Sequence, residues 1–330
     1  ISIDLKYNKA TLLSSFIYCN FEKKSDMLSV REISFSYIDK PIVKKVSFSL
    51  TKGKNLAIIG ESGCGKSTLL KLIYGLHDLD AGQIFWNDIE VLGPKYHLIP
   101  GMPFMKYLAQ DFDLMPFITV AENVGKYLSN FFPEDKQVRI AELLEIVEMT
   151  EYADVKAKLL SGGQMQRVAL ARVLALEPEV LLLDEPFSHI DNFRKNSLRR
   201  NLFAYLKEKS ITCIVATHDS TDVLAFADEV AIMKQGKIIE SGIPEFIYNH
   251  PQNYYIASLF GDVNEIVLQD EKHLVYPHKL KVVINSDLKV EIINSYFRGS
   301  HYLIEAKYGN QTVFFENEVA IEKAEIVFLK

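Results

Sequence analysis

Residues 60–68 carry the spacing G-x-x-x-x-G-K-S, which is typical of a loop that wraps around phosphate groups. Glycines let the backbone N–H groups converge on phosphate oxygens, and a following helix adds the positive end of its dipole. Lys66 offers a positive charge to the β- and γ-phosphates, and Ser67 offers a hydroxyl to Mg²⁺. An apolar run before the loop and a helical pattern after it favour phosphate binding over a ligand-free glycine turn. The residues predicted to bind a nucleoside triphosphate are Gly60, Glu61, Ser62, Gly63, Cys64, Gly65, Lys66, Ser67 and Thr68.

Three further groups of residues could carry chemistry. Asp184 and Glu185 follow an apolar run, where a carboxylate can hold Mg²⁺ through water, although adjacent carboxylates also occur at ordinary solvated strand ends. His218 follows another apolar run, and a lone histidine is usually structural. A serine and two glycines at 161–163 precede a helical pattern and could form a second anion site or an ordinary helix cap.

The elements that position these residues alternate between strand and helix, which predicts a mostly parallel α/β core. Two antiparallel strands precede the phosphate loop, and a helical region covers about 111–176. Strands are predicted at 28–37, 43–50, 55–59, 83–86, 89–91, 106–109, 180–184 and 211–216. Helices are predicted at 68–74, 120–131, 136–149, 165–176 and 196–209.

Composition limits the class of protein. The 330 residues are enough for two domains, and the net charge of −6 argues against a nucleic-acid binder. Cys19, Cys64 and Cys213 lie far apart, which suggests neither a disulfide framework nor a zinc site and fits a reducing cytosol. No stretch approaches the roughly 20 apolar residues of a membrane span, so other chains would have to cross any membrane at which this protein acts.

Together these motifs resemble those of the nucleotide-binding subunits of ABC (ATP-binding cassette) transporters, from about residue 28 to the C-terminus. Residues 160–164 match the family's signature, and 180–184 match its Walker B strand. The resemblance implies ATP and Mg²⁺ as ligands and a head-to-tail dimer of two copies. In such a dimer, each signature caps the ATP held by the partner's phosphate loop. The signature residues in this role would be Ser161, Gly162, Gly163 and Gln164.

The resemblance also implies roles for single residues. Glu185 would be the general base, His218 would contact the γ-phosphate, and Lys66 would bind the phosphates. Gln110 matches the Q-loop glutamine, which would reach Mg²⁺ and the attacking water. The residues implied at the metal are Ser67, Gln110 and Asp184.

Three matches leave a question open. Tyr37 matches the aromatic residue that stacks on adenine, but it could instead pack into the core. Residues 188–191 match the D-loop, where Asp191 is kept and His189-Ile190 replaces the family's usual Ala-Leu, so the role of His189 is open. Cys64 could be a redox-sensitive thiol, although a small residue at a variable position is the simpler interpretation.

The two ends of the chain differ from the core. Residues 1–26 are predicted to be an extension outside the core, and residues 27–261 are predicted to form the ATPase domain. Residues 262–330, here called the tail, show strand patterns at 289–293, 302–308, 311–315 and 326–329, with a turn at Gly309-Asn310. The tail predicts a small all-β OB-like barrel and resembles the TOBE domain of importers. It has few clustered basic residues, which argues against oligonucleotide binding, and its role could be regulatory or only dimer-stabilising.

The resulting hypothesis is the ATP-hydrolysing subunit of an ABC importer at the cytoplasmic face of the membrane. Its expected partners are a second copy of itself, transmembrane permease subunits that contact the region after Gln110, and a substrate-binding protein, but no nucleic acid. Iron(III) or a polyamine is the expected cargo. The alternatives are a soluble ABC ATPase of translation or DNA repair, or the ATPase subunit of an exporter.

Overall fold

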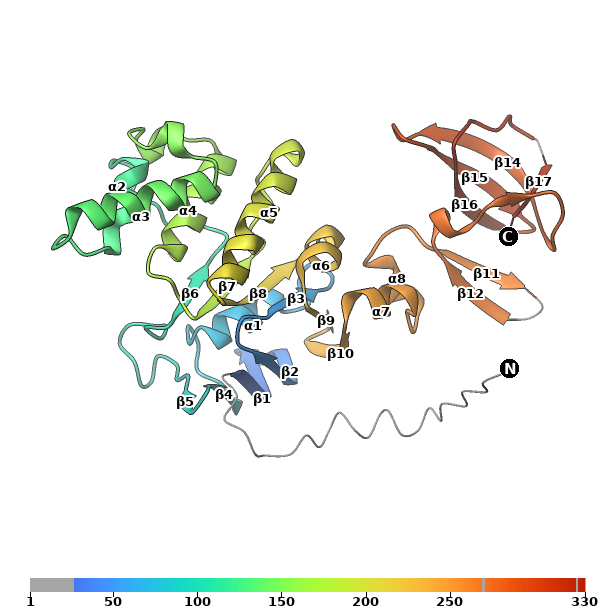
Figure 1. Ribbon diagram of the computed structural model, residues 1–330. Coiled ribbons are helices and arrows are strands. Elements are labelled where there is room, and N and C mark those ends of the chain that lie inside the picture. Colours follow the sequence, from blue (N-terminus) through green and yellow to red (C-terminus); the bar gives the residue numbers. More distant parts are fainter. Residues whose placement is uncertain (1–26, 269–270, 325, 330) are drawn as a thin grey trace, which may run out of the picture.

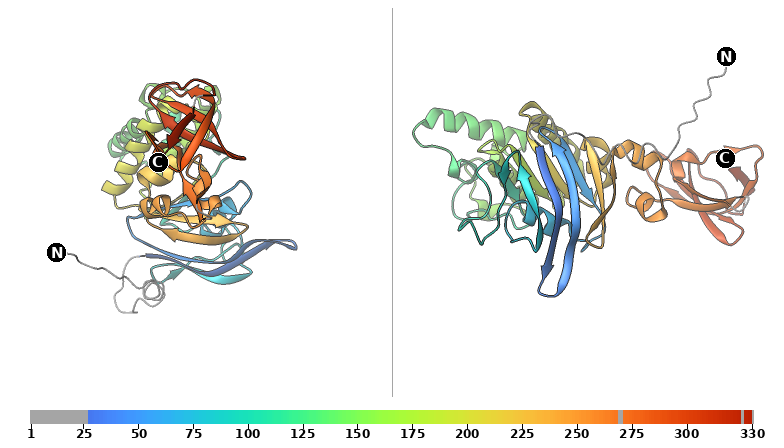
Figure 2. Two further views of the ribbon diagram at one scale, coloured as in Figure 1. Left: turned by 90° about the vertical axis from the view of Figure 1, so that its right-hand side faces the viewer. Right: turned by 90° about the horizontal axis from the view of Figure 1, so that it is seen from below.

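The computed structural model describes residues 27–268, 271–324 and 326–329. The predicted N-terminal extension at 1–26, with Cys19, lies outside the described residues. The described chain forms a large α/β part and a smaller all-β tail joined by short helices (Figure 1), and the tail extends away from the α/β part (Figure 2). In the part of the chain described here, no helix has the length and apolar character needed to cross a membrane.

A six-stranded sheet forms the centre of the α/β part, with the strand order β10-β9-β3-β8-β7-β6. The strands run parallel from β6 to β9, and β10 pairs antiparallel with β9. Every residue of β7 and β8 is buried, which explains their continuous apolar runs. Because parallel strands end at the same edge, the segments after β3, β7 and β8 come together there. The bounds are β3 Asn55–Ile59, β6 Met105–Leu108, β7 Val180–Asp184, β8 Thr212–Thr217, β9 Glu229–Lys234 and β10 Lys237–Gly242.

A four-stranded antiparallel sheet in the order β2-β1-β4-β5 forms a second layer, and the two antiparallel strands predicted before the phosphate loop are its β1 and β2. Helix α1 (Lys66–Ile73) shares one apolar core with both sheets, and fully buried Trp86 belongs to that core. The helix that follows the phosphate loop is therefore fixed by packing on two sides. The strands of this sheet are β1 Met27–Tyr37, β2 Lys40–Thr51, β4 Ala81–Trp86 and β5 Ile89–Glu90.

The helical region gathers at the end of the α/β part that lies away from the tail (Figure 1). Its helices and the long helix α5 share a core with β7 and β8. Helix α4 begins three residues earlier than predicted, because Ser161 caps it. The bounds are α2 Val120–Val124, α3 Pro133–Ile146, α4 Gly162–Leu174 and α5 Asn192–Glu208, with 3₁₀ turns at Gly125–Tyr127, Thr150–Tyr152 and Ala157–Leu159.

The prediction of one helix over 120–131 is wrong. Helix α2 ends at Val124, and Leu128 already has an extended backbone. A Cβ atom on Gly125 would lie 2.6 Å from Cδ1 of Ile140, so α3 packs directly onto the turn at that glycine. Val120, Val124 and Leu128 all contact the same core at four-residue spacing, which imitates the pattern of a continuous helix.

The tail contains a five-stranded antiparallel sheet in the order β13-β17-β14-β15-β16, which curls into a half-barrel (Figure 2). The predicted turn at Gly309 joins β15 and β16, with Tyr308 paired to Gln311. A two-stranded ribbon, β11 and β12, precedes this sheet and was not predicted. The bounds are β11 Asn264–Leu268, β12 Glu271–Val275, β13 Val282–Val283, β14 Leu288–Phe297, β15 Tyr302–Tyr308, β16 Gln311–Asn317 and β17 Ile326–Leu329, with a 3₁₀ turn at Pro277–Lys279.

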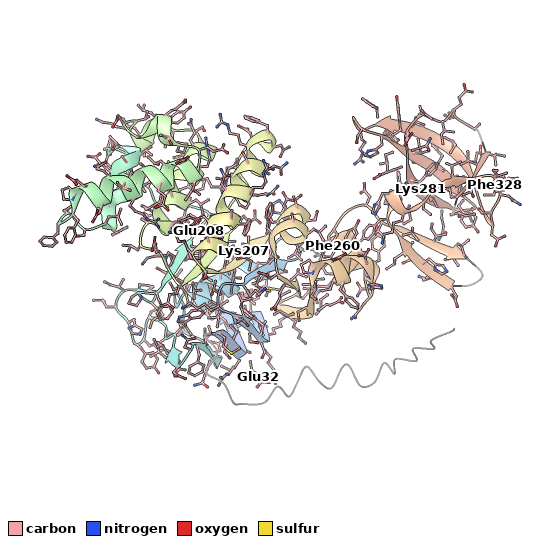
Figure 3. The ribbon with its side chains drawn as sticks, in the orientation of Figure 1. Glu32, Lys207, Glu208, Phe260, Lys281 and Phe328 are labelled. Carbon is pink, nitrogen blue, oxygen red and sulfur yellow. The ribbon has the colours of Figure 1, made fainter. Side chains whose placement is uncertain are left out.

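Aromatic side chains join the tail to the α/β part. The rings of Tyr248 and Tyr276 stack with centroids 4.4 Å apart, and the Tyr276 hydroxyl donates to the Ala257 carbonyl at 3.2 Å. Phe260 is buried where the chain enters the tail (Figure 3). The tail therefore packs against the short helices that precede it and is not connected by an extended linker alone. These helices are α7 Pro244–Asn249 and α8 Tyr254–Ser258, whereas α6 Ser220–Phe226 lies between β8 and β9 in the α/β part.

Candidate nucleotide-binding site

The phosphate loop lies between β3 and α1, as predicted, and its glycines are required by the backbone. Gly63 and Gly65 have positive φ angles of 79° and 111°, which other residues rarely adopt. A Cβ atom on Gly60 would lie only 2.1 Å from the Met233 carbonyl oxygen. No side chain caps the first turn of α1, so its N–H groups can face an anion.

The Lys66 side chain is buried inside the loop. Its Nζ atom donates to the carbonyl oxygens of Gly60 at 2.7 Å and Glu61 at 3.1 Å. These contacts hold the ammonium group against the loop, where phosphate oxygens could compete for its protons. The backbone N–H of Glu61 also reaches the Tyr255 hydroxyl at 3.5 Å, so a residue from α8 borders the loop. Ser62 is exposed, and Thr68 is half-buried in α1.

Ser67 and Asp184, two of the residues implied at the metal, lie in contact. The Ser67 hydroxyl donates to Asp184 Oδ1 at 2.9 Å, and the Tyr107 hydroxyl donates to Asp184 Oδ2 at 3.2 Å. Asp184 is buried, and burial raises the pKa of its carboxyl group although both hydrogen bonds oppose this. Mg²⁺ prefers oxygen ligands, and a hydroxyl next to a carboxylate supplies them, so these residues fit that ion. With ATP, Mg²⁺ would neutralise phosphate charge.

Glu185 and His218 also meet. His218 Nδ1 lies 3.1 Å from Glu185 Oε1. Glu185 has a φ angle of +48°, its N–H donates to the Ala216 carbonyl, and its own carbonyl accepts from Gln166 Nε2 at 2.9 Å. Strained backbone of this kind is often found at functional sites. This contact places a carboxylate and an imidazole beside Asp184 at the edge of the sheet.

The signature residues form a capping box at the start of α4. The Gln164 N–H reaches Ser161 Oγ at 3.4 Å, and the Ser161 N–H donates to Gln164 Oε1 at 2.9 Å. Gly163 approaches the D-loop so closely that a Cβ atom would lie 2.6 Å from the His189 carbonyl oxygen, whereas Gly162 has open space. Ser161 is exposed, so its cap does not prevent it from meeting a ligand on another chain. The predicted contact with a partner's ATP stays a prediction.

Gln110 and Tyr37 lie apart from these contacts. Gln110 is exposed in a bend just after β6. Tyr37 is 42% exposed, its ring meets Phe35 edge-on at 4.8 Å, and its hydroxyl lies 3.2 Å from His77 Nε2. Phe35 is the buried residue of this pair, and Tyr37 does not pack into the core. Its predicted stacking on adenine stays a prediction.

Cys64 is buried within the phosphate loop at 7% exposure. Burial raises the pKa of the Cys64 thiol, and this outweighs the opposing effect of Lys66. A thiol of this kind is mostly protonated near neutral pH and reacts slowly. The structure therefore favours the simpler interpretation of this cysteine, as a small residue that fits the loop.

Several residues at the site were missed by the sequence analysis. Gln166 is buried, and its Oε1 atom accepts from the His189 N–H at 3.0 Å, so it links α4 to the D-loop. Arg199 donates to Asp222 Oδ1 at 2.6 Å and pairs with Asp219, which follows His218 directly. A polar residue inside a helical pattern gives no sign of a buried partner that is distant in the sequence. Tyr107 was missed because it lies on strand β6, and its contact with Asp184 depends on β6 and β7 being neighbours in the sheet.

A parallel sheet with a phosphate loop after β3, a buried carboxylate at the end of β7 and a Glu–His pair beside it defines a P-loop nucleotide-binding protein. The family model described as ABC transporter matches residues 43–188. The chain is 37% identical over 240 residues to the putrescine transport ATP-binding protein PotG of Escherichia coli (strain K12), covering 72% of this chain and 63% of the relative. It is 42% identical over 240 residues to the Fe(3+) ions import ATP-binding protein FbpC 1 of Rhodococcus jostii (strain RHA1), covering 71% and 67%.

A solved dimeric ATP-binding cassette, bound to ADP and Pi in a post-hydrolysis state, matches with a TM-score of 0.58 and 27% identity. That match covers 66% of this chain and 98% of the other. The chain belongs to the ABC transporter family of ATP-binding proteins. It spans about two thirds of the length of the two curated relatives.

Proposed function

We propose that the protein is the ATP-hydrolysing subunit of an ABC importer and acts with Mg²⁺. The observation that carries the proposed hydrolysis is the 3.1 Å contact between Glu185 and His218, next to Asp184 and Ser67. Family membership supports it, and the two curated relatives named above are transport and import ATP-binding proteins. In this proposal residues 27–261 form the ATPase domain and residues 262–330 form a TOBE-like domain.

In the proposed reaction, the loop N–H groups and Lys66 hold the β- and γ-phosphates of ATP. Glu185 accepts a proton from a water molecule while the water oxygen bonds to the γ-phosphorus and the bond to the bridging oxygen breaks. His218 lies against Glu185 and would orient that water, and Gln110 would have to move from its exposed position after β6 to reach the same region. The products are ADP and phosphate.

The proposed assembly is a head-to-tail dimer that closes on two ATP molecules and pulls on two permease subunits. Ser161 and Gly163 of each copy would contact the γ-phosphate held by the other copy. The protein would lie at the cytoplasmic face of the membrane, and a substrate-binding protein would complete the system. The proposed cargo is iron(III) or a polyamine, by analogy with the names of the relatives.

The variant Glu185→Gln tests this function. It keeps the size of the side chain but removes the base, so steady-state hydrolysis should fall at least 100-fold while ATP stays bound. Glu208→Gln is the matched control, because Glu208 lies at the end of α5 (Figure 3), and among the described residues its side chain forms only an ion pair with Lys209. Normal turnover by Glu185→Gln would refute the assignment of the base.

A pull-down of tagged Glu185→Gln protein from membranes with ATP tests the transport role. A polytopic permease among the captured proteins would support an importer, and uptake of ⁵⁵Fe³⁺ or labelled putrescine by the reconstituted complex would identify the cargo. Ribosomal or DNA-repair proteins without a permease would contradict the proposal.

A further inference from the structure

Tyr107 belongs to no motif, yet it contacts the carboxylate that is central to the predicted metal site. It lies on β6, opposite Leu182 of β7, and its hydroxyl donates to Asp184 Oδ2 at 3.2 Å. Ser67 donates to the other oxygen, Oδ1, at 2.9 Å. Each oxygen of this one carboxylate therefore has its own donor, one from the end of the phosphate loop and one from a neighbouring strand.

The ring of Tyr107 is held in place by a second tyrosine. Tyr74, at the end of α1, lies against it with ring centroids 5.6 Å apart. Tyr74 in turn covers Gly101 so closely that a Cβ atom there would lie 2.4 Å from the Tyr74 ring. A carboxylate oxygen can only accept, so the Tyr107 hydroxyl is the donor in this hydrogen bond. A fixed ring and a protonated hydroxyl make the contact with Asp184 directional.

We propose that Tyr107 is a positioning residue that holds the Asp184 carboxylate in the orientation required to bind Mg²⁺ together with the nucleotide. The inference rests on the proposed function, because it assumes that Asp184 serves a Mg²⁺–ATP site. Tyr107 itself would touch neither the nucleotide nor the ion. Without its hydroxyl, Asp184 would keep, among the described residues, only the side-chain donor Ser67, whose hydroxyl oxygen is also predicted to bind Mg²⁺, and the free carboxylate oxygen could rotate away.

The variant Tyr107→Phe removes the hydroxyl and keeps the ring that packs on Tyr74. A fluorescent ATP analogue, titrated with Mg²⁺ in the Glu185→Gln background, reports binding without turnover. The Mg²⁺ concentration at half-saturation should rise about tenfold, since one hydrogen bond to a charged group is lost and tenfold corresponds to about 1.4 kcal/mol. Binding of the analogue in EDTA, and the thermal midpoint in EDTA, should stay within about twofold and a few degrees of the parent.

The variant Tyr74→Phe is the matched control, because it removes a neighbouring hydroxyl that is not a hydrogen-bond partner of Asp184 among the described residues. It should leave the Mg²⁺ midpoint unchanged. An unchanged midpoint for Tyr107→Phe, or an equal shift for both variants, would overturn the inference and leave Tyr107 a packing residue. If the parent protein binds no ATP analogue with or without Mg²⁺, the proposed function itself fails, which is a different result.

Discussion

Replacing Gly163 with alanine should destabilise the protein, whereas the same change at Gly162 should not. A Cβ atom on Gly163 would lie 2.6 Å from the His189 carbonyl oxygen, and a Cβ atom on Gly162 has nothing within 4 Å. Real Cβ contacts are almost never shorter than 3.0 Å, so α4 and the D-loop would have to separate by at least 0.4 Å. The D-loop cannot easily move, because the His189 N–H is held by Gln166 of α4 itself.

The size of the effect follows from two opposing contributions. Alanine in place of a helical glycine stabilises a protein by about 0.4–1 kcal/mol, because the unfolded chain loses freedom. Overpacking a close contact costs about 1–3 kcal/mol. Gly162→Ala should therefore be neutral or slightly stabilising, and Gly163→Ala should lose about 1–2 kcal/mol, so the two variants should differ by about 2 kcal/mol.

Urea unfolding in EDTA, without nucleotide, measures this difference. Omitting nucleotide matters because both glycines are also predicted to bind ATP held by a partner, and a change in binding would shift apparent stability. The slopes of the transitions should match, with only the midpoints differing. Equal midpoints for the two variants would mean that the close approach of α4 to the D-loop does not exist in solution.

Two further predictions concern Cys64 and Asp219. In a Cys19→Ser background, the native protein should react with a maleimide at pH 8 at least tenfold more slowly than the protein unfolded in urea. The reason is that Cys64 is buried and the pKa of its thiol is raised. Equally fast labelling of the native protein would support the hypothesis of a redox-sensitive thiol instead. Burial alone would raise the pKa of Asp219, but hydrogen bonds from the Thr221 N–H and Arg199 hold this pKa below its usual value. The ionised Asp219 carboxylate should therefore stabilise the protein above about pH 4, and this effect should disappear as the pH falls below that. Asp219→Asn, which can still cap α6, should be less stable than wild type at pH 6, and this difference in the free energy of unfolding should disappear by pH 3. A difference that stays constant with pH in urea unfolding would contradict this reasoning.

The parts of the site that sequence predicts well are local. The phosphate loop and its flanking strand and helix follow from neighbouring residues, because positive φ angles at Gly63 and Gly65 and the apolar run before them are properties of short segments. The residues at which helices begin and end were less predictable. Val120, Val124 and Leu128 share a core at helical spacing although the helix ends at Val124, since tertiary packing imitates the pattern.

Contacts between distant segments could not be predicted from one sequence. Tyr107 reaches Asp184 because β6 and β7 are parallel neighbours. The order of strands in a sheet cannot be predicted from the local sequence pattern of each strand. Gln166 likewise reaches Glu185 from a helix that begins at a different motif. Such residues become candidates only when the topology of the sheet is known.

The adjacent carboxylates Asp184 and Glu185 illustrate why the backbone matters for chemistry. On a regular strand, neighbouring side chains point to opposite faces, and nothing in the sequence says which carboxylate would meet which partner. Asp184 ends β7 with a buried carboxylate between two hydroxyl donors, an environment suited to holding a cation. Glu185 leaves the strand with a φ angle of +48°, and this turn directs its carboxylate to His218. A single backbone change therefore gives two chemically identical groups different partners, and the proposed division of work between metal binding and proton transfer depends on it.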